Sequence, residues 1–334
     1  MRLSRRCALT ALALALAGAA APAQAQVQAQ DYPNRPITIV VPLAPGSGMD
    51  SLVRLYADRL QQALGKPVVV ENKPGAALML AAAAVATAPP DGYTLLVSTS
   101  SAMAINLALY KKVNYDAVKD FIPVSFYVKS PFILVVNTDL PAKTVPELIK
   151  LAKEREGGTP LNFSSPGAGV AQHLSVEYMK QRFNVNMVHV PYRNTPQSIT
   201  DIVAGHVQLG FAEAGASLPL IRDGKLRALA VSSLTRIPSL PDTPPFAEAA
   251  SAPDFEAVSW HMLFAPRGTP RPIVDKLHAE MTKIMADPEM QQKAATIGLL
   301  PIKPPSIEET EKYLAGERQK WGDLVRKLGL EGSQ

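Results

Sequence analysis

The chain has 334 residues, a single cysteine and a formal net charge of +5. Its basic residues form neither a run nor a stripe, and this excludes the electrostatic footprint of a nucleic-acid-binding protein. At this length, two α/β lobes are favoured over one domain.

The N-terminal residues have the layout of an export signal. Residues 1–25 begin with arginines, continue with an apolar run over 8–21 and end in Ala23-Gln24-Ala25. This pattern predicts a signal peptide cleaved near Ala25, and the run is too short to span a bilayer. Because no later segment is long and apolar enough either, we expect a soluble periplasmic protein. Removing three arginines lowers its net charge from +5 to about +2.

The only cysteine, Cys7, precedes the apolar run, whereas a lipoprotein acceptor would follow it. We therefore expect no lipid anchor, and cleavage excludes disulfides, thiol nucleophiles and thiolate metal sites. The export route stays open between two alternatives. Arg5-Arg6 fits a twin-arginine signal, but Ala8 stands where a bulky apolar residue is usual, which favours general secretion.

Strand-like and helix-like segments alternate through two series, which predicts parallel sheets covered by helices on both faces. The first series comprises strands at Ile37–Val41, Val68–Val70 and Thr94–Val97 and helices at Asp50–Leu64 and up to Ala88. A β-like run, Val124–Val136, leads to a helix at Val145–Lys153 with Pro146 in its first turn. The second series comprises strands at Leu161–Phe163, Met187–Val190, Val207–Phe211 and Leu226–Val231 and helices at Ala171–Phe183 and Pro196–Ala204.

The C-terminal part is expected to return to the first series. Helices at Ile273–Met285 and Glu308–Leu328 would pack on it after the run Phe255–Ala265. This arrangement predicts one lobe from 31–130 plus 253–334, a second from 131–252, and crossings near Lys129–Pro131 and Ala252–Asp254. Two segments that cross between lobes make a hinge.

Two glycine-containing loops connect strands to helix starts. In Pro42–Asp50, glycines let the backbone approach a ligand, and free N–H groups at the helix start favour an anion. Asp50 is expected to cap the helix, because a carboxylate facing an anion is repulsive. Ser164–Gly169 repeats the pattern in the second series. Its Gly-x-Gly is not a dinucleotide loop, since Gln172 replaces the third glycine and no acidic residue ends the next strand.

Further candidates follow other strands, at the edge where open α/β sheets bind ligands. The hydroxyls of Thr99 and Ser100 either donate to a carboxylate or belong to a solvated loop. Glu213 either accepts from a ligand hydroxyl or ammonium group, or pairs with Arg193. An aromatic residue near the hinge, Trp260, either covers the ligand or is core.

Catalytic and metal-binding motifs are missing. There is no Gly-x-Ser-x-Gly elbow, Walker loop or His-Glu-x-x-His motif, and the five histidines include no pair at metal-binding spacing on one helix. We therefore expect neither cofactor nor metal, and no enzyme. A Ser-His-acid triad assembled from distant segments stays open.

Ordered matches along nearly all of the chain after the leader resemble the Bug-type receptors of tripartite tricarboxylate transporters. The segments that carry the resemblance are Pro36–Pro42, Pro45–Asp50, Val70–Ala76, Pro90–Leu96, Ser165–Gly167, His173-Leu174, His189–Arg193, Gly224–Ala230, Pro241–Pro244, Trp260 and Ala265–Pro270. The resemblance implies a type II periplasmic-binding-protein fold of two α/β lobes that closes on a carboxylated solute without a cofactor. It also implies that Pro45–Asp50 and Ser164–Gly169 face the ligand from opposite lobes, with backbone amides and ordered water holding a carboxylate.

The chain departs from the family pattern at two loops. Gly46-Ser47 replaces Gly-Gly, and Ala77–Ala81 replaces a Gly-Gly-x-x-Gly segment, which brings Leu78 and Met79 where the family keeps open backbone. This predicts a ligand with an apolar or aromatic body beside its carboxylate. The residues expected to bind it are Leu43, Gly46, Ser47, Gly48, Met49, Leu78, Met79, Thr99, Ser100, Ser164, Ser165, Gly167, Ala168, Gly169, Arg193 and Glu213.

The expected partners are a small organic carboxylate and the membrane subunits of a transporter, with the receptor itself a monomer. Two alternatives stay open. One is a subunit that senses the ligand for a membrane signalling protein, and the other is an envelope hydrolase of small carboxylate esters.

Overall fold

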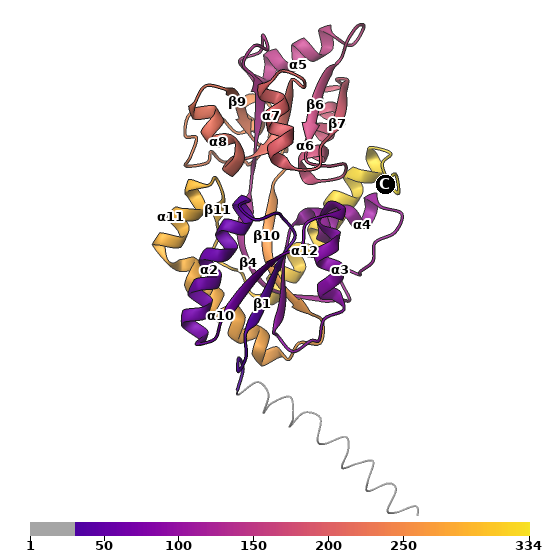
Figure 1. Ribbon diagram of the computed structural model, residues 1–334. Helices are drawn as coiled ribbons and strands as arrows, with labels where there is room; N and C mark the ends of the chain where they lie inside the picture. The colour runs from indigo at the N-terminus through magenta and orange to yellow at the C-terminus, as the bar shows by residue number, and fades with distance from the viewer. Residues whose placement is uncertain (1–30) are drawn as a thin grey trace, which may run out of the picture.

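The computed structural model describes residues 31–334, so the predicted leader lies outside it. Two sheets lie one above the other, each with helices on both faces (Figure 1). The first has the order β11-β4-β10-β3-β1-β2 and the second β7-β6-β8-β5-β9. The strands of the first sheet are β1 (Ile37–Val41), β2 (Val68–Asn72), β3 (Thr94–Ser98), β4 (Phe121–Ser130), β10 (Ser259–Pro266) and β11 (Leu300–Pro301). Those of the second are β5 (Phe132–Asn137), β6 (Leu161–Ser165), β7 (Met187–Pro191), β8 (Leu209–Glu213) and β9 (Leu226–Val231).

Helices flank the first sheet on both sides. They are α2 (Gly48–Leu64), η1 (Ala76–Leu78), α3 (Met79–Ala86), η2 (Ser101–Ile105), α4 (Asn106–Leu109), α10 (Arg271–Ala286), α11 (Pro288–Thr296) and α12 (Ile307–Lys327). Those of the second sheet are α5 (Val145–Glu154), α6 (Ala171–Phe183), α7 (Thr195–Val203), α8 (Ala214–Arg222) and α9 (Phe246–Ala249). Within residues 31–334, no helix has the length and apolar character that a bilayer crossing requires.

The prediction of purely parallel sheets is wrong, although β1 does pair in parallel with β2 and β3, and β6 with β7 and β8. Strand β10 runs antiparallel to β3 and β4 because it enters the first sheet from the second. Strand β5 follows β4 without a helical crossover, and it runs antiparallel to β8 and β9. The mixed sheets therefore follow from the two direct passages of the chain between them.

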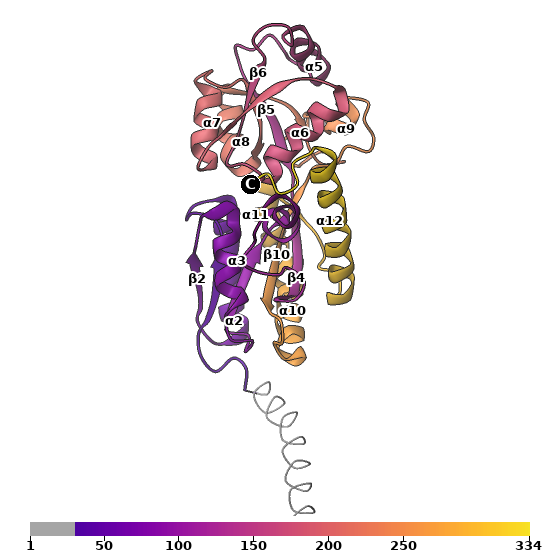
Figure 2. The same ribbon diagram turned by 90° about the vertical axis from the view of Figure 1, so that its right-hand side faces the viewer.

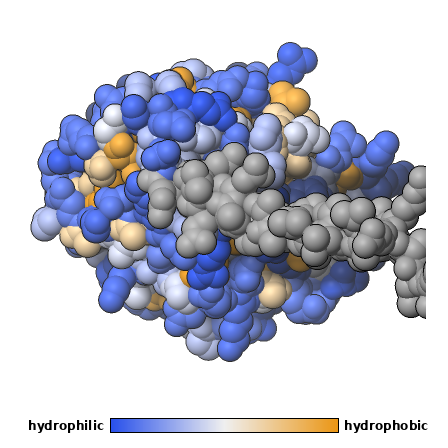
Figure 3. Space-filling view, turned by 90° about the horizontal axis from the view of Figure 1, so that it is seen from below, coloured by the Kyte–Doolittle hydropathy of each residue, from blue (hydrophilic) through white to orange (hydrophobic). Residues whose placement is uncertain are grey.

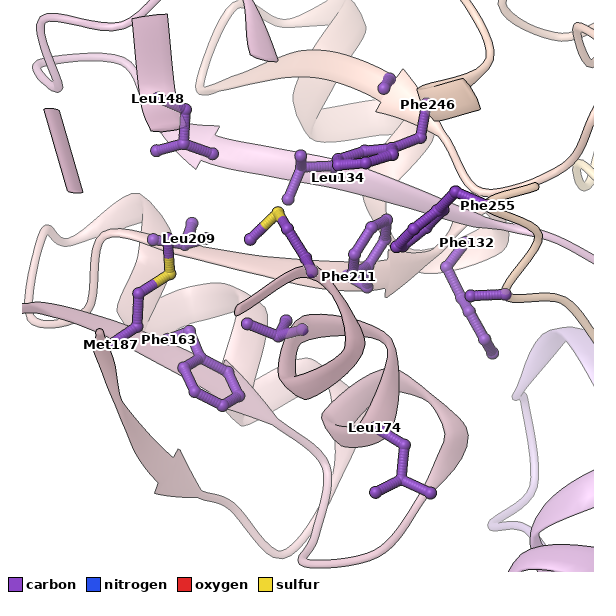
Figure 4. Close-up of a cluster of buried hydrophobic side chains, with 14 of the residues drawn as sticks. Phe132, Leu134, Leu148, Phe163, Leu174, Met187, Leu209, Phe211, Phe246 and Phe255 are labelled. Atoms are coloured by element: carbon purple, nitrogen blue, oxygen red, sulfur yellow. The ribbon is translucent and has the colours of Figure 1, made fainter. Parts of the chain in front are cut away.

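Alternation along the strands divides each core into two halves. On β5, Phe132, Leu134 and Val136 pack toward α5, α6 and α9, whereas Ile133 and Val135 pack toward α7 and α8. Figure 4 shows the first of these clusters, in which the rings from β8, α9 and the segment before β10 meet. In the first sheet, α2 and α10 cover one face and α3, η2 and α12 the other.

The chain passes between the sheets twice, at adjacent places. Strand β4 ends at Ser130 and β5 begins at Phe132, which agrees with the predicted first crossing. On the return, Ala257 N–H still donates to Ser232 O in the second sheet, while Ser259 already pairs with Ser130. The backbone contacts favour a second crossing near 258, C-terminal to the predicted one, and the single-residue lobe boundaries stay a prediction.

Helix α12 joins the two bodies along one side. It packs on β4 and η2, and its last turns place Trp321 and Val325 in the cluster of the second sheet, so α12 runs beside both bodies (Figure 2). Trp260 is fully buried in the first body, which assigns it to the core. The end of the molecule seen in Figure 3 is hydrophilic over most of its surface, with small separate apolar areas.

A buried carboxylate fixes α12 to strand β10. Glu317 Oε2 accepts hydrogen bonds from the indole nitrogens of Trp260 at 2.9 Å and Trp321 at 3.0 Å. Both indoles are almost fully buried, so neither N–H has water as an alternative partner. The position therefore requires an acceptor.

We predict that Glu317→Leu lowers the free energy of unfolding by roughly 2–4 kcal/mol, because it leaves two buried donors unsatisfied. Glu317→Gln retains an acceptor oxygen and should lose less. Gln319→Leu, at an exposed position of the same helix, is the control and should stay within about 0.5 kcal/mol. Urea unfolding followed by tryptophan fluorescence measures all three, and a Glu317→Leu chain as stable as the native one would contradict the assignment.

Candidate ligand-binding site

The start of α2 is held by its own loop. Ser47 is the N-cap, and its Oγ accepts from Asp50 N at 3.2 Å. In return, the carboxylate of Asp50 accepts from Gly46 N at 2.8 Å. The prediction that Asp50 caps the helix is therefore wrong, because Ser47 is the N-cap, but Asp50 holds the loop at the helix start from the first turn.

Asp50 is anchored from three sides. Arg54 Nε donates to Oδ2 at 3.0 Å, and Asn72 Nδ2 donates to Oδ1 at 2.8 Å and to Leu43 O at 2.9 Å. Burial by itself raises the pKa of Asp50, but the hydrogen bonds from Arg54, Gly46 and Asn72 outweigh it, so the pKa lies below its usual value. The loop that carries Gly46 and Ser47 is thus fixed by a charged, hydrogen-bonded support.

The N-terminus of α8 lies opposite the N-terminus of α2, between the two sheets. A Cβ atom on Gly215 would lie 3.8 Å from Gly48 Cα and 3.9 Å from Ile297 O. Within residues 31–334, the amides of Gly48 and Gly215 have no backbone or side-chain acceptor. Two sets of first-turn N–H groups therefore converge from opposite bodies, and such groups favour an anion.

Between these helix starts lies a narrow cavity, with about 10 Å³ open to the centre of a water molecule. Its walls come from both bodies and from the first crossing. They are formed by Gly48, Met49, Ser130, Pro131, Glu213, Ala214, Gly215, His261, Ile297, Gly298 and Leu299. The room suffices for about one water molecule, so a larger ligand enters only if the bodies separate.

Two titratable side chains line this cavity. His261 on β10 is 5% exposed, its Nδ1 has no partner within residues 31–334, and burial lowers its pKa to about 3. Glu213 is half-buried, and burial raises the pKa of its carboxyl, while Gln172 Nε2 at 3.4 Å acts in the opposite direction. Arg193 is exposed and forms no ion pair with Glu213 within the described chain, so the pairing alternative is wrong.

The second predicted loop, Ser164–Gly169, rests on two stacked histidines. The rings of His173 and His189 lie 3.9 Å apart at 19°. Ser165 Oγ lies 2.7 Å from His189 Nε2 and donates to Gly167 O at 2.7 Å, while Gly169 N donates to His173 Nδ1 at 3.1 Å. Because Ser165 has a single proton, His189 Nε2 is the donor in its bond to that hydroxyl.

The bond from Gly169 N requires a neutral His173 ring, and the surroundings keep both rings uncharged. Burial lowers the pKa of His173 to about 3, with further contributions from His189 and Lys180. Burial, followed by the charge of Lys180, lowers the pKa of His189 to about 4. At neutral pH the loop is therefore held by uncharged hydrogen bonds.

The 164–169 loop faces η2 and α4 and lines no part of the cavity described above. Ser101 Oγ accepts from Ala171 N at 3.3 Å, and Tyr110 Oη donates to Ala168 O at 3.5 Å. A Cβ on Gly169, whose φ is +79°, would lie 1.8 Å from Leu109 Cδ2. Only glycine fits so close a contact between the bodies.

The remaining predicted residues have partners inside one body. Ser100 Oγ contacts Ser259 Oγ at 2.9 Å, Thr99 Oγ1 accepts from Ser101 N at 3.3 Å, and Ser164 Oγ donates to Ser198 O at 3.3 Å. Thr99 and Ser100 are buried, so the alternative of a solvated loop is wrong. Met49 is 2% exposed and packs in the core behind α2, although it also lines the cavity.

Leu78 and Met79 follow an unusual backbone. Ala76, Ala77 and Leu78 have φ values of 47°, 49° and 72°, a region that favours glycine. Asn106 Nδ2 holds this path by donating to Ala77 O at 2.8 Å. Leu78 and Met79 are half-buried against the cluster around α3. The turn therefore has backbone angles typical of glycine although no glycine occupies these positions.

The structure has two α/β bodies, two adjacent passages between them and converging helix starts, which is the architecture of a two-lobed solute-binding protein. The chain belongs to the family described as TctC, Tripartite tricarboxylate transporter family receptor, whose model matches residues 52–330. The predicted fold class and family are therefore confirmed, and the chain is a solute-binding receptor of this family.

Solved structures resemble the chain over most of its length. "R. palustris Rpa4515 with adipate" is 33% identical, covers 90% of this chain and 99% of its own, and has a TM-score of 0.83. "Periplasmic binding protein BugD" is 32% identical, with 90% and 99% covered and a TM-score of 0.81. "MatC (Rpa3494) from Rhodopseudomonas palustris with bound malate" is 31% identical, with 88% and 100% covered and a TM-score of 0.79.

We predict that stability falls as the pH drops from about 7 toward 5, because of His173, His189 and His261. In the unfolded chain each takes up a proton near its ordinary pKa of about 6.5, whereas the folded rings stay neutral down to about 4 or 3. Their stabilisation is therefore complete above pH 6.5 and is lost below it. Urea unfolding at half-unit pH steps measures the slope, and His261→Gln should reduce it.

His206→Gln is the matched control, because His206 is exposed and its replacement should leave the slope unchanged. A free energy of unfolding that is flat or rises between pH 7 and 5 would show that the buried rings take up protons normally.

Proposed function

We propose that this receptor operates in the periplasm as a monomer, closes on a small carboxylate and delivers it to the membrane subunits of its transporter. The observation that carries the proposal is the convergence of two helix starts, at Gly48 and Gly215, on one cavity. Backbone N–H groups at helix starts bind carboxylates without a cofactor. The similar structures whose names include adipate and malate support the same ligand class. Its leader pattern supports export.

Closure is the step that creates the site. The cavity between Gly48 and Gly215 admits about one water molecule, so the ligand enters while the lobes are apart. Within residues 31–334, the two crossings at 130–132 and 258–259 are the only covalent links between the sheets, and they are the hinge that we propose. Once the lobes are closed, the ligand would be held by N–H groups from both lobes. Neither lobe provides all of these groups by itself.

The polar atoms beside the helix starts suit a ligand that also carries a donor group. His261 is neutral with an unpartnered Nδ1, and Glu213 has a carboxyl whose raised pKa reflects burial. Either can accept from a hydroxyl or ammonium group of the ligand. The apolar or aromatic body of the acid stays a proposal from the sequence at Leu78 and Met79, since neither side chain lines the cavity between Gly48 and Gly215. Nanomolar binding of citrate without binding of aromatic acids would refute that last point.

We infer that the chain is not an enzyme. One pair has the spacing of a nucleophile and a base, since Ser165 Oγ lies 2.7 Å from His189 Nε2. However, Ser165 is 1% exposed, its proton is donated to Gly167 O, and the pKa of His189 is lowered to about 4. A buried hydroxyl beside a weak base supports a structural role. The sensing alternative would use the same ligand site with a different membrane partner.

The proposal is tested by calorimetric titration of the mature chain with malate, adipate, citrate and benzoate. At 100 times its dissociation constant, a bound acid should stabilise the protein by about 2.7 kcal/mol. Gly215→Leu puts a side chain between the lobes at a helical position where φ is ordinary. It should weaken binding at least about tenfold, or 1.4 kcal/mol, without lowering the melting temperature.

The matched control is Gly316→Leu in α12, where a new Cβ meets nothing within 4 Å. It should bind as the native chain does. Binding of none of these acids, or a Gly215→Leu chain whose affinity is unchanged for every acid that binds, would overturn the proposed site.

A further inference from the structure

A second and larger cavity lies in the first lobe, away from the space between the sheets. It has a volume of about 250 Å³ and lies where β4 begins, β10 ends and α12 passes over both. None of its lining residues lines the cavity between Gly48 and Gly215. Whatever it holds is therefore separate from the ligand of the receptor cleft.

The floor of this cavity is apolar and preformed. Phe121, Phe264 and Leu314 are each at most 2% exposed, and the two rings contact edge to face with centroids 6.2 Å apart. Pro123 adds a further apolar wall. Because these side chains are fixed in the core of the first lobe, the floor needs no rearrangement to receive a hydrocarbon group.

One rim of the cavity carries a positive charge that no carboxylate neutralises. Arg318 on α12 is half-buried, and it donates to Met103 O at 3.3 Å and to Ala117 O at 3.0 Å. Within residues 31–334, no carboxylate oxygen lies within 4.0 Å of its guanidinium nitrogens. Burial lowers the pKa of Arg318, yet a guanidinium remains charged at neutral pH.

The other rim is already balanced. Arg267 Nη1 lies 3.2 Å from Glu311 Oε1, and Arg267 Nη2 donates to Val118 O at 2.9 Å. The charge of Asp116 also acts on Arg318, but the Asp116 carboxylate is paired with Lys119 Nζ at 3.2 Å. The cavity therefore has two guanidinium groups and one carboxylate at its rim, which leaves an excess of one positive charge beside an apolar floor.

We propose that this cavity is a second binding site, for a small monocarboxylic acid with an apolar or aromatic stem. The carboxylate accepts hydrogen bonds from Arg318, and the stem lies between the exposed side chains of Val118 and Ala315, above the buried Phe264 and Leu314. A fork of N–H donors suits a carboxylate, and the floor favours a hydrocarbon stem over a bare anion. The volume is below the range of about 300–1,000 Å³ that is typical for drug-sized ligands, which limits the acid to the size of benzoate or hexanoate.

The test titrates the full mature chain with benzoate while ¹H–¹⁵N spectra are recorded. The Gly215→Leu chain, whose cleft is blocked, should bind benzoate as the native chain does at this second site. Arg318→Met should weaken this binding at least tenfold, and Lys320→Met, at an exposed position on the same helix, should leave it unchanged. Ala315→Trp fills the cavity from an exposed position and should abolish binding even if Arg318→Met fails to fold.

Acetate and inorganic phosphate identify the recognised chemistry, and both should bind at least tenfold more weakly than benzoate. Phosphate binding tighter than benzoate would overturn the ligand class. Loss of all benzoate binding in Gly215→Leu, unchanged binding in Ala315→Trp, or no binding by the native chain would overturn the site. If the proposed cleft site is wrong, the result is different, because Gly215→Leu then leaves the binding of every acid unchanged.

Discussion

The structure depends on two short connections that lie side by side. Ser130 pairs with Ser259 at the end of the β4–β10 ladder, directly before the chain passes through Pro131 into the second sheet. Ser232 fastens both connections on the other side, since its hydroxyl accepts from Phe132 N at 2.8 Å and its carbonyl accepts from Ala257 N at 3.1 Å. Every other contact between the lobes is non-covalent. The position of one lobe on the other is therefore set at this joint and can change there.

Each lobe has its own sheet with apolar residues packed on both faces. Alternating apolar residues fill both faces of each sheet, and Glu317 ties the buried indoles of Trp260 and Trp321 into one unit. Surfaces that meet across the joint are shaped for close approach. Gly48 faces Gly215 at van der Waals distance, and Gly169 lies so close to Leu109 that a Cβ there would meet Leu109 Cδ2 at 1.8 Å. Glycine at these contact points suits the proposed closure of the lobes around a small anion.

Much of this arrangement follows from local sequence patterns. The alternation of apolar residues predicts most strands and helices, and the crossing predicted near Lys129–Pro131 falls where the long β-like run divides into β4 and β5. Asp50 supports the helix start from the first turn, although it is not the predicted cap. The length and the two series of elements already predict two lobes, and the family resemblance adds the type II periplasmic-binding-protein fold.

What the sequence could not provide is the relative position of the lobes. The sequence does not predict helix α8, because Ala214 and Gly215 are typical of a loop and Pro219 interrupts the helical pattern. The start of α8 could therefore not be recognised as the partner of the start of α2. His261 has no motif, and its orphan nitrogen appears only once β10 is buried between the lobes. The left-handed course of Ala76–Leu78 is likewise imposed by tertiary contacts such as that of Asn106, against the preference of the residues themselves.

We expect carboxylate binding to close the two lobes about the joint at 130–132 and 258–259. The mature chain lacks cysteine after cleavage at the predicted site, so spin labels at Gln62→Cys on the first lobe and Asp223→Cys on the second report one inter-lobe distance. Pulsed electron–electron double resonance measures this distance without ligand and with a saturating concentration of an acid that calorimetry shows to bind. We expect a broad distribution of the distance between the labels without ligand, and a narrow distribution at the shorter distance with ligand. A distribution that saturating ligand leaves unchanged would contradict closure as the basis of recognition.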